Sequence, residues 1–180
     1  MASLILIRHC ESSGQTPDAA LTEAGARAAE ALIDRLQELD PDAVYSSPYR
    51  RARTTVQPFA DRAGLSVTLD ERLHERVLSA EPLDDWLEHI RRSYEDIDHR
   101  PGEGGETLRE TQARGLAALN EIVARGHRLP VVASHGNLIS TVLRAANPRF
   151  GFDDWRGLRN PDLFELTFEA GRLDGYRRLD

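Results

Sequence analysis

The sequence predicts an α/β protein: a three-layer α/β/α sandwich with a mostly parallel central sheet and a small helical cap. Short apolar runs at 4–7 and 130–133 have the length and composition of fully buried strands. Amphipathic helical patterns alternate with these and other short strand patterns, as in folds whose helices cover both faces of a sheet. The 180 residues are expected to form one domain, residues 1–180, with the cap at about 70–105.

The first half of the chain gives three strands separated by two helices. The strands are expected at 4–7, 43–46 and 66–69. Thr22 is the expected N-cap of the first helix, which ends at Asp40-Pro41. The second helix begins at Ser47-Pro48, with proline in its first turn. Pro58 is expected to kink or break that helix, because proline removes a backbone hydrogen bond.

The second half begins with a charged segment and returns to the strand–helix alternation. An amphipathic helix is expected over 82–97, with its apolar face formed by Leu83, Trp86, Leu87 and Ile90. A capping box beginning at Thr107 opens a long helix that closes near Gly126. A strand at 130–134, a helix at 137–146, a strand at 163–168 and a last short strand after the turn at 170–172 complete the prediction.

The overall composition narrows the classes of function. The chain carries 23 basic and 30 acidic residues, and its net charge of −7 argues against general nucleic-acid binding. No apolar run is long enough to span a membrane, and the N-terminus lacks the features of a signal peptide. A cytoplasmic location is therefore expected. Cys10 is the only cysteine, which excludes an intrachain disulfide and a multi-cysteine metal site. The composition leaves the oligomeric state open.

Reactive side chains follow the predicted strands at the points where they end. In open α/β sheets, the carboxyl ends of parallel strands meet at the ligand-binding edge. Phosphoryl transfer without a metal requires a nucleophile, cations that bind the phosphoryl oxygens and an acid. The groups at this edge are two histidines, several arginines, a carboxylate and a helix N-terminus, which together meet that requirement. These groups are Arg8 and His9 after the first strand, Ser47, Arg50, Arg51 and Arg53 after the second, Glu75 beyond the third, and His135 with Gly136 and Asn137 after the fourth.

Several blocks in order resemble the histidine phosphatase (phosphoglycerate mutase-like) superfamily. The run Arg8-His9-Cys10-Glu11-Ser12 is similar to its R-H-G-E-S/T signature. The other blocks are Leu21–Gly25 for L-T-x-x-G, Ser47–Thr54 for S-P-L-x-R-A-x-x-T, Arg72–Glu75 for the block that carries the acid, Gly104–Thr107 for G-G-E-S, and Val131–Asn137 for V-V-x-S-H-G-x. The resemblance covers nearly the whole chain.

The resemblance implies a role for each matching residue. His9 would be the nucleophile that becomes phosphohistidine, and Glu75 the proton donor. The phosphoryl group would be bound by Arg8, Arg51 and His135, with further substrate contacts from Ser12, Gln15, Gly136 and Asn137. The implied enzyme is a metal-independent phosphomonoesterase that needs no cofactor and acts on a small phosphorylated metabolite. The segment between Glu75 and His135 is shorter than in typical mutases, which favours hydrolysis.

The chain also departs from the family pattern. Cys10 replaces the signature glycine, Gln15 stands where asparagine is common, and Arg76-Val77-Leu78-Ser79 replaces the usual glycine-tryptophan pattern after the acid. His9-Cys10 superficially resembles the H-C-x5-R loop of cysteine phosphatases, but Thr16 stands where that loop needs arginine. The alternatives are phosphoglycerate mutase-type transfer, a metal site of His9, His135 and Glu75, and a phosphate-binding module without turnover.

The remaining candidates are assigned supporting roles. Glu11 and Glu106 are expected to orient Arg8 or His9. Trp86 and Trp155 are expected to be packing residues, with Trp86 an alternative wall of the substrate pocket. Four arginines of the cap are candidates for binding a second anionic group of the substrate: Arg76, Arg91, Arg92 and Arg100.

Overall fold

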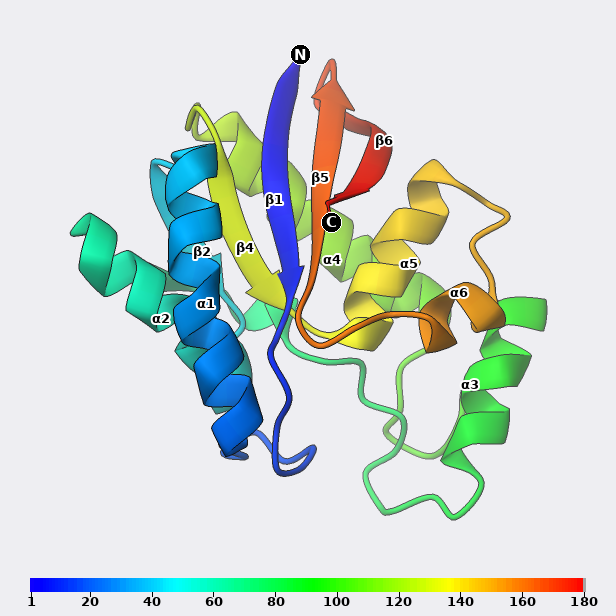
Figure 1. The fold of residues 1–180 in the computed structure, drawn as a ribbon. Helices are drawn as coiled ribbons and strands as arrows, with labels where there is room; N and C mark the ends of the chain where they lie inside the picture. The colour runs from blue at the N-terminus through cyan, green and yellow to red at the C-terminus, as the bar shows by residue number, and fades with distance from the viewer. Residues whose placement is uncertain (180) are drawn as a thin grey trace.

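A mixed six-stranded sheet forms the centre of the protein, seen in a computed structural model that describes residues 1–179 (Figure 1). The strand order is β3-β2-β4-β1-β5-β6. Strands β1 to β4 run parallel to one another, and β5 pairs antiparallel with both β1 and β6. The bounds are β1 Ala2–Arg8, β2 Ala43–Ser46, β3 Val67–Leu69, β4 Pro130–Ser134, β5 Asp162–Glu169 and β6 Arg172–Leu179.

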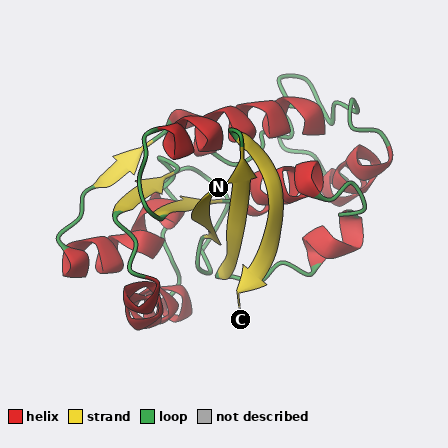
Figure 2. Cartoon of the chain, turned by 90° about the horizontal axis from the view of Figure 1, so that it is seen from above, coloured by secondary structure: helices red, strands yellow, loops and turns green. Residues whose placement is uncertain are grey.

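Helices cover both faces of this sheet, which confirms the predicted α/β fold (Figure 2). Helices α1 and α2 pack on one face, while α4 and α5, flanked by α3 and α6, cover the other. Ile5 and Ile7 of β1 face α1 and α2, whereas Leu4 and Leu6 face α4 and α5, because successive strand residues point to opposite faces. The bounds are α1 Glu23–Leu39, α2 Arg50–Ala63, α3 Trp86–Glu95, α4 Leu108–Ala124, α5 Gly136–Ala146 and α6 Phe152–Arg156.

The starts of α1 and α4 follow the predicted capping residues, whereas α2 begins at Arg50, after the predicted start at Ser47-Pro48. The Thr22 side chain accepts a hydrogen bond from the backbone N–H of Gly25, and α1 ends at Asp40 in the left-handed conformation. Thr107 and Glu110 form the predicted capping box at the start of α4. These side chains satisfy backbone groups that the first helical turn leaves without partners.

Pro58 was predicted to kink or break α2, and the prediction of a break is wrong. The helix continues from Arg50 to Ala63 with Pro58 inside it. Val56, Phe59 and Ala60 on both sides of the proline are buried in the core against α1 and the sheet. Burial of this continuous apolar face offsets the local cost of a proline in a helix, about 3 kcal/mol.

The cap helix is shorter than predicted and rests on a different face. It begins at Trp86 rather than at Pro82, and a short 3₁₀ helix at Glu71–Leu73 precedes the loop that leads to it. Trp86 and Leu87 are 47% and 44% exposed, so they do not share the buried face of Ile90. Helix α3 is instead anchored through Ile90, Ser93 and Tyr94, which follow helical spacing. Within residues 1–179, no helix has the length and apolar character needed to cross a membrane.

Candidate active site

The two histidines lie together at the carboxyl ends of adjacent strands. In the parallel pair of β1 and β4, Arg8 lies opposite Ser134, so His9 and His135 are the next residues on each strand. Their ring centroids are 5.2 Å apart in an edge-on arrangement. The backbone N–H of His9 also donates to the carbonyl of Ser134. The expected juxtaposition of the two imidazoles therefore follows directly from strand register.

His9 is held as a neutral imidazole with a defined tautomer. Its Nδ1 lies 2.7 Å from the backbone carbonyl oxygen of Cys10. Because a carbonyl can only accept, Nδ1 carries the proton and Nε2 keeps its lone pair. Arg51 Nε donates to that Nε2 at 3.2 Å. Burial lowers the pKa of His9 to about 4, and the positive charges of Arg51 and Arg8 contribute to the decrease. The imidazole is thus unprotonated, as a nucleophile must be.

Two arginines beside His9 have no carboxylate partner. Arg51 is fully buried, and its Nη1 donates to the carbonyl oxygens of Gln15 and Thr16 at 3.1 and 2.9 Å. Arg8 Nη1 donates to the carbonyl of Leu158 at 2.8 Å. Among the ion pairs of residues 1–179, none includes Arg8 or Arg51, and burial lowers the pKa of both guanidinium groups.

These buried cations still have hydrogen-bond donors to spare. Arg8 Nε and Arg51 Nη2 are buried without a partner in the described chain, as is Nδ1 of His135. The other ring nitrogen of His135, Nε2, lies 2.8 Å from Ser47 Oγ. Because unpaired buried charge is costly, an anion that accepts from these donors would be strongly favoured. The arrangement fits a phosphoryl group held next to His9 Nε2.

Gly136 allows Arg8 to lie over the start of α5. A Cβ atom at this position would lie only 3.1 Å from Arg8 Nε and 3.2 Å from its Cζ. The close approach brings the guanidinium against the helix N-terminus without a side chain between them. The glycine of the V-V-x-S-H-G-x block therefore has a steric role here.

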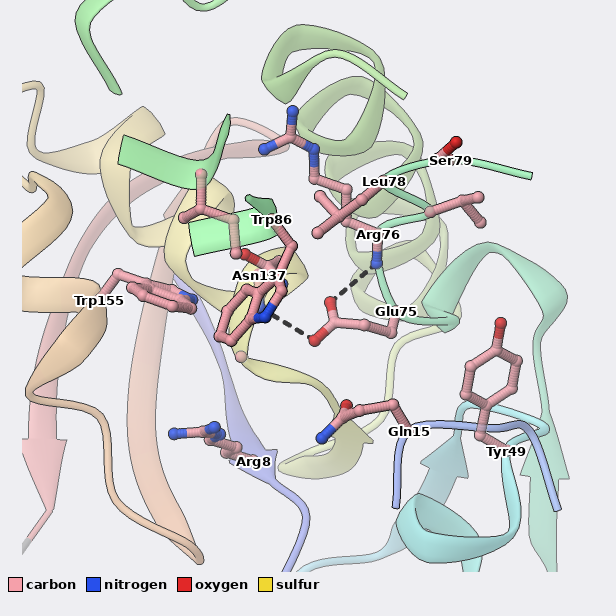
Figure 3. Close-up of a pocket in the computed structure, with 13 residues that line it drawn as sticks. Arg8, Gln15, Tyr49, Glu75, Arg76, Leu78, Ser79, Trp86, Asn137 and Trp155 are labelled. Atoms are coloured by element: carbon pink, nitrogen blue, oxygen red, sulfur yellow. Dashed lines mark hydrogen bonds between the residues drawn. The ribbon is translucent and has the colours of Figure 1, made fainter. Parts of the chain in front are cut away.

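Glu75 occupies the N-terminus of α5. Its carboxylate accepts from the backbone N–H groups of Arg76 at 2.8 Å and of Asn137 and Leu138, each at 3.3 Å (Figure 3). The sequence pattern assigned this helix N-terminus to the phosphate, whereas the structure places the acid there. The three backbone N–H groups fix the position of the carboxyl group at the start of the helix. The acid and the two histidines are thereby collected at one edge of the sheet.

A half-buried ion pair that the sequence did not reveal supports the loop that carries Glu75. Arg114 of α4 binds the Glu106 carboxylate at 2.7 Å and donates to the carbonyl oxygens of Arg72 and His74. Glu106 also accepts from the backbone N–H of Val77. Arg114 lies inside a helix without a motif around it, so no local signal identifies it.

The predicted roles of Glu11 and Glu106 are wrong. Glu106 binds Arg114 rather than Arg8 or His9. The Glu11 carboxylate accepts from the hydroxyl of Thr22 and helps hold the start of α1. Both carboxylates therefore support backbone segments near the site, and neither forms an ion pair with Arg8 or Arg51.

A pocket of about 590 Å³ is lined by Arg8 and Glu75 (Figure 3). The buried side chains of His9, Arg51 and His135 are not among its lining residues. Of the predicted substrate contacts, Gln15, Gly136 and Asn137 line it, whereas the Ser12 hydroxyl donates to the carbonyl of Gly14. Trp155, assigned to packing, also lines it. The full wall consists of Arg8, Gln15, Tyr49, Glu75, Arg76, Val77, Leu78, Ser79, Trp86, Ile90, Gly136, Asn137 and Trp155.

Cys10 is poorly suited to act as a nucleophile. Its side chain is buried in the core against α1 and α2, and its backbone N–H donates to Thr55 Oγ1 at 2.9 Å. Burial raises the pKa of the Cys10 thiol to about 11, which suppresses the reactive thiolate. In residues 1–179, no three histidine, cysteine or carboxylate side chains are grouped so as to hold a metal ion.

Comparisons with known proteins agree with the motifs. The model of the histidine phosphatase superfamily (branch 1) matches residues 4–175. Glucosyl-3-phosphoglycerate phosphatase of Mycolicibacterium vanbaalenii is 30% identical, covering 96% of this chain and 86% of its own length. A probable phosphoglycerate mutase of Erwinia tasmaniensis is 32% identical, covering 79% and 75%.

A solved structure shows the same fold. The structure of a mycobacterial glucosyl-3-phosphoglycerate phosphatase is 25% identical, with a TM-score of 0.76 over 98% of this chain and 96% of the other. The resemblance found in the sequence and the predicted class of enzyme are confirmed. The chain belongs to branch 1 of the histidine phosphatase superfamily.

Proposed function

We propose that this protein is a metal-independent phosphomonoesterase that hydrolyses a small phosphorylated metabolite through a phosphohistidine on His9. The observation that carries the proposal is the state of His9. Its Nδ1 proton is bound to the Cys10 carbonyl, and its Nε2 lone pair faces a guanidinium that has no carboxylate partner. Attack on a phosphate dianion requires a neutral, oriented imidazole beside cations that have hydrogen-bond donors free to bind the phosphoryl oxygens.

In the first step, His9 Nε2 attacks phosphorus while the bond from phosphorus to the leaving oxygen breaks. Arg51 Nε releases the Nε2 lone pair and donates to a phosphoryl oxygen instead, together with Nη2. Arg8 and His135 bind the remaining oxygens as negative charge redistributes in the transition state. Glu75 enters this step protonated, transfers its proton to the departing alkoxide oxygen and is a carboxylate when the step ends. The products are phosphohistidine and a free alcohol.

In the second step, water replaces the alcohol. Glu75, now ionised, accepts a proton as water attacks the phosphorus, and the bond between phosphorus and Nε2 breaks. Inorganic phosphate leaves, His9 returns to its neutral form, and Glu75 is protonated again. The pocket over Glu75 provides room for water once the alcohol has departed.

Hydrolysis is favoured over mutase chemistry by the small size of the cap. The segment between β3 and α4 contains one short 3₁₀ helix and one helix, α3. It leaves a pocket open to the outside through which the alcohol can leave before the phosphoenzyme reacts. A mutase would have to retain its phosphorylated intermediate and return the phosphoryl group to it.

The test is to trap the phosphoenzyme with labelled substrate and a quench that avoids acid. Wild-type protein and Cys10→Ser should both carry label on His9, and His9→Ala should carry none. Cys10→Ser is the matched control because it alters the neighbouring residue without touching the imidazole. Label retained by His9→Ala and lost in Cys10→Ser would transfer the chemistry to the cysteine. Absence of label from all three proteins during turnover would exclude a covalent intermediate.

A further inference from the structure

The outer half of the pocket is built from apolar and aromatic side chains. Leu78 follows the acid loop, Ile90 and Trp86 come from α3, and Trp155 comes from α6. Figure 3 shows both tryptophans on the opposite side of Glu75 from Tyr49. This part of the pocket lies beyond the phosphoryl site, where the alcohol portion of a phosphomonoester must extend.

The two tryptophans differ in how they are held. Trp155 stacks on Phe152 with ring centroids 5.5 Å apart and an interplanar angle of 22°, and Phe152 lies 6.5 Å from Tyr94 of α3. Trp86 begins α3 and leaves 47% of its surface exposed beside the pocket. A fixed aromatic wall and a partly uncovered one together offer a surface for an apolar or planar group.

Arg76 is the cap arginine that reaches the pocket wall, but its charge is turned away from the site. It is 3% exposed, with Nε and Nη2 bound to the Glu106 carbonyl at 3.0 and 2.9 Å and Nη2 also bound to Ser93 Oγ. Its guanidinium points away from Glu75 in Figure 3. Nη1 of Arg76 is buried without a partner in the described chain. Binding of an anionic leaving group by Arg76 is therefore the alternative that the experiment must exclude.

The remaining cap arginines lie outside the pocket wall. Arg91 pairs with Glu88 and Glu95, Arg100 pairs with Glu110, and Arg92 lies on the exposed surface. Glu75 also lines the wall, and its carboxyl group supplies no positive charge to bind a second anion. Among the described residues, the arginines that line the pocket are Arg8, assigned to the phosphoryl group, and Arg76, whose guanidinium is turned away. A carboxylated leaving group would therefore find no further cation in this described part of the wall.

We infer that the preferred substrate is a phosphomonoester of a neutral, apolar or aromatic alcohol, with its leaving group packed between Trp86 and Trp155. The inference rests on the proposed phosphatase function and specifies its substrate class. Apolar contact made equally in the ground and transition states lowers KM and raises kcat/KM.

The experiment compares primary-alcohol phosphates with similar leaving-group chemistry. The probes are 2-phenylethyl phosphate and n-hexyl phosphate against O-phosphoserine and 3-phosphoglycerate. Wild-type protein should have a kcat/KM at least about 10-fold higher for the first two. Trp86→Ala should lower kcat/KM for 2-phenylethyl phosphate about 10-fold, chiefly through KM, and leave that for O-phosphoserine unchanged. Leu87→Ala removes a similarly exposed neighbour outside the pocket wall and should change neither.

The other outcomes distinguish failure of the inferred substrate class from failure of the proposed phosphatase function. A wild-type preference for the carboxylated probes, or equal losses in Trp86→Ala on every probe, would overturn the inference while leaving the phosphatase function intact. A selective loss of the carboxylated probes in Arg76→Met, in protein with an unchanged circular dichroism spectrum, would assign the outer pocket to an anion. No hydrolysis of any probe, with no label on His9, would count against the proposed function itself.

Discussion

The floor and the rim of the pocket are built on different principles. The name floor is used here for His9, Arg51 and His135, which are buried at strand ends or in the first turn of a helix and do not themselves line the pocket. Backbone carbonyls and a buried hydroxyl fix their polar atoms. The rim is formed by side chains of loops and short helices, among them Trp86, which is half exposed.

This difference separates chemistry from selectivity. The floor groups are held by the backbone, so their positions depend on the sheet and little on what surrounds the pocket. The rim residues lie on loops and short helices outside the paired strands, so they can be exchanged without altering strand register. Substitutions in the floor should therefore affect all substrates, and substitutions in the rim should affect some. Glu75 lies between the two regions and tests the division most sharply.

The largest expected effect is that of Glu75→Gln. Glu75 lines the pocket with the rim residues, but its proposed role as proton donor places it in the reaction itself. The variant keeps the size of the side chain but cannot donate a proton. With an alkyl phosphate, phosphoenzyme formation should slow by about 10²–10⁴-fold, the usual range for general acid catalysis. With p-nitrophenyl phosphate, whose leaving group departs without protonation, the loss should be much smaller.

Burst rates of both proteins on both substrates provide the measurement. Equal losses on the two leaving groups would mean that Glu75 only positions another group, and Glu81 or Asp84 would be the next acids to examine.

Arg51→Ala should have the next largest effect, and it should be independent of the leaving group. Removing one donor to the transition state typically lowers kcat by about 10²–10³-fold. The same loss on aryl and alkyl phosphates would place Arg51 firmly in the floor. Arg50→Ala, next to it on α2 and exposed, is the matched control and should be nearly neutral.

The same preparations test whether a metal takes part. Wild-type activity should persist in excess chelator and should be inhibited by vanadate. Complete loss on chelation, reversed by zinc or magnesium, would contradict the arginine-based mechanism.

Arg114→Met should show how far support for the acid loop matters. Arg114 touches the carbonyl oxygens behind Glu75 but does not line the pocket. Displacing the acid by about 1 Å lowers the rate by up to about 10²-fold. The loss should follow that of Glu75→Gln, large for alkyl phosphates and small for p-nitrophenyl phosphate. A uniform loss on both would show a general structural role instead.

Protonation of His9 should have no effect at neutral pH and a measurable one in acid. The folded pKa is lowered to about 4 by burial, from 6.5 in the unfolded chain. The unfolded state therefore binds the proton first as pH falls, and the free energy of unfolding decreases between about pH 6.5 and 4. At pH 5 this group should contribute about 2 kcal/mol of the decrease.

Urea unfolding of wild-type protein and His9→Gln at pH 7 and pH 5 measures this contribution. The variant lacks the titrating ring and should lose less stability over the same interval. An equal decrease in the free energy of unfolding of both proteins between pH 7 and pH 5 would show that folding does not change the protonation of His9.

The sequence was informative where a site residue belongs to a contiguous strand or turn. The succession of strands along the chain and the strand ends at Arg8-His9 and Ser134-His135 can be predicted because apolar runs mark buried strands. The capping residues Thr22 and Thr107 were likewise correct. Assignments of catalytic roles to these residues stay predictions until the variants are measured.

What the sequence did not reveal depends on contacts between distant segments. Trp155 belongs to a helix of five residues that no periodicity marks, and Arg114 reaches the acid loop across about forty positions of sequence. Pro58 was misjudged because the packing of α2 outweighs a local propensity. Each of these features depends on tertiary contacts between residues that are distant in the sequence, so the local sequence pattern does not predict it.

The position of β1 in the sheet governs the order in which the protein can assemble. It is the first strand of the chain, yet its two partners are β4 and β5, and Ile5 pairs with Val131 on one side and Glu165 on the other. The apolar run at 4–7 therefore leaves the ribosome long before either neighbour exists. Pairing over such sequence separations is slow and exposes strand edges meanwhile. Recovery of phosphatase activity during refolding should consequently be among the last signals to appear, because His9 and His135 meet only when β1 and β4 have joined.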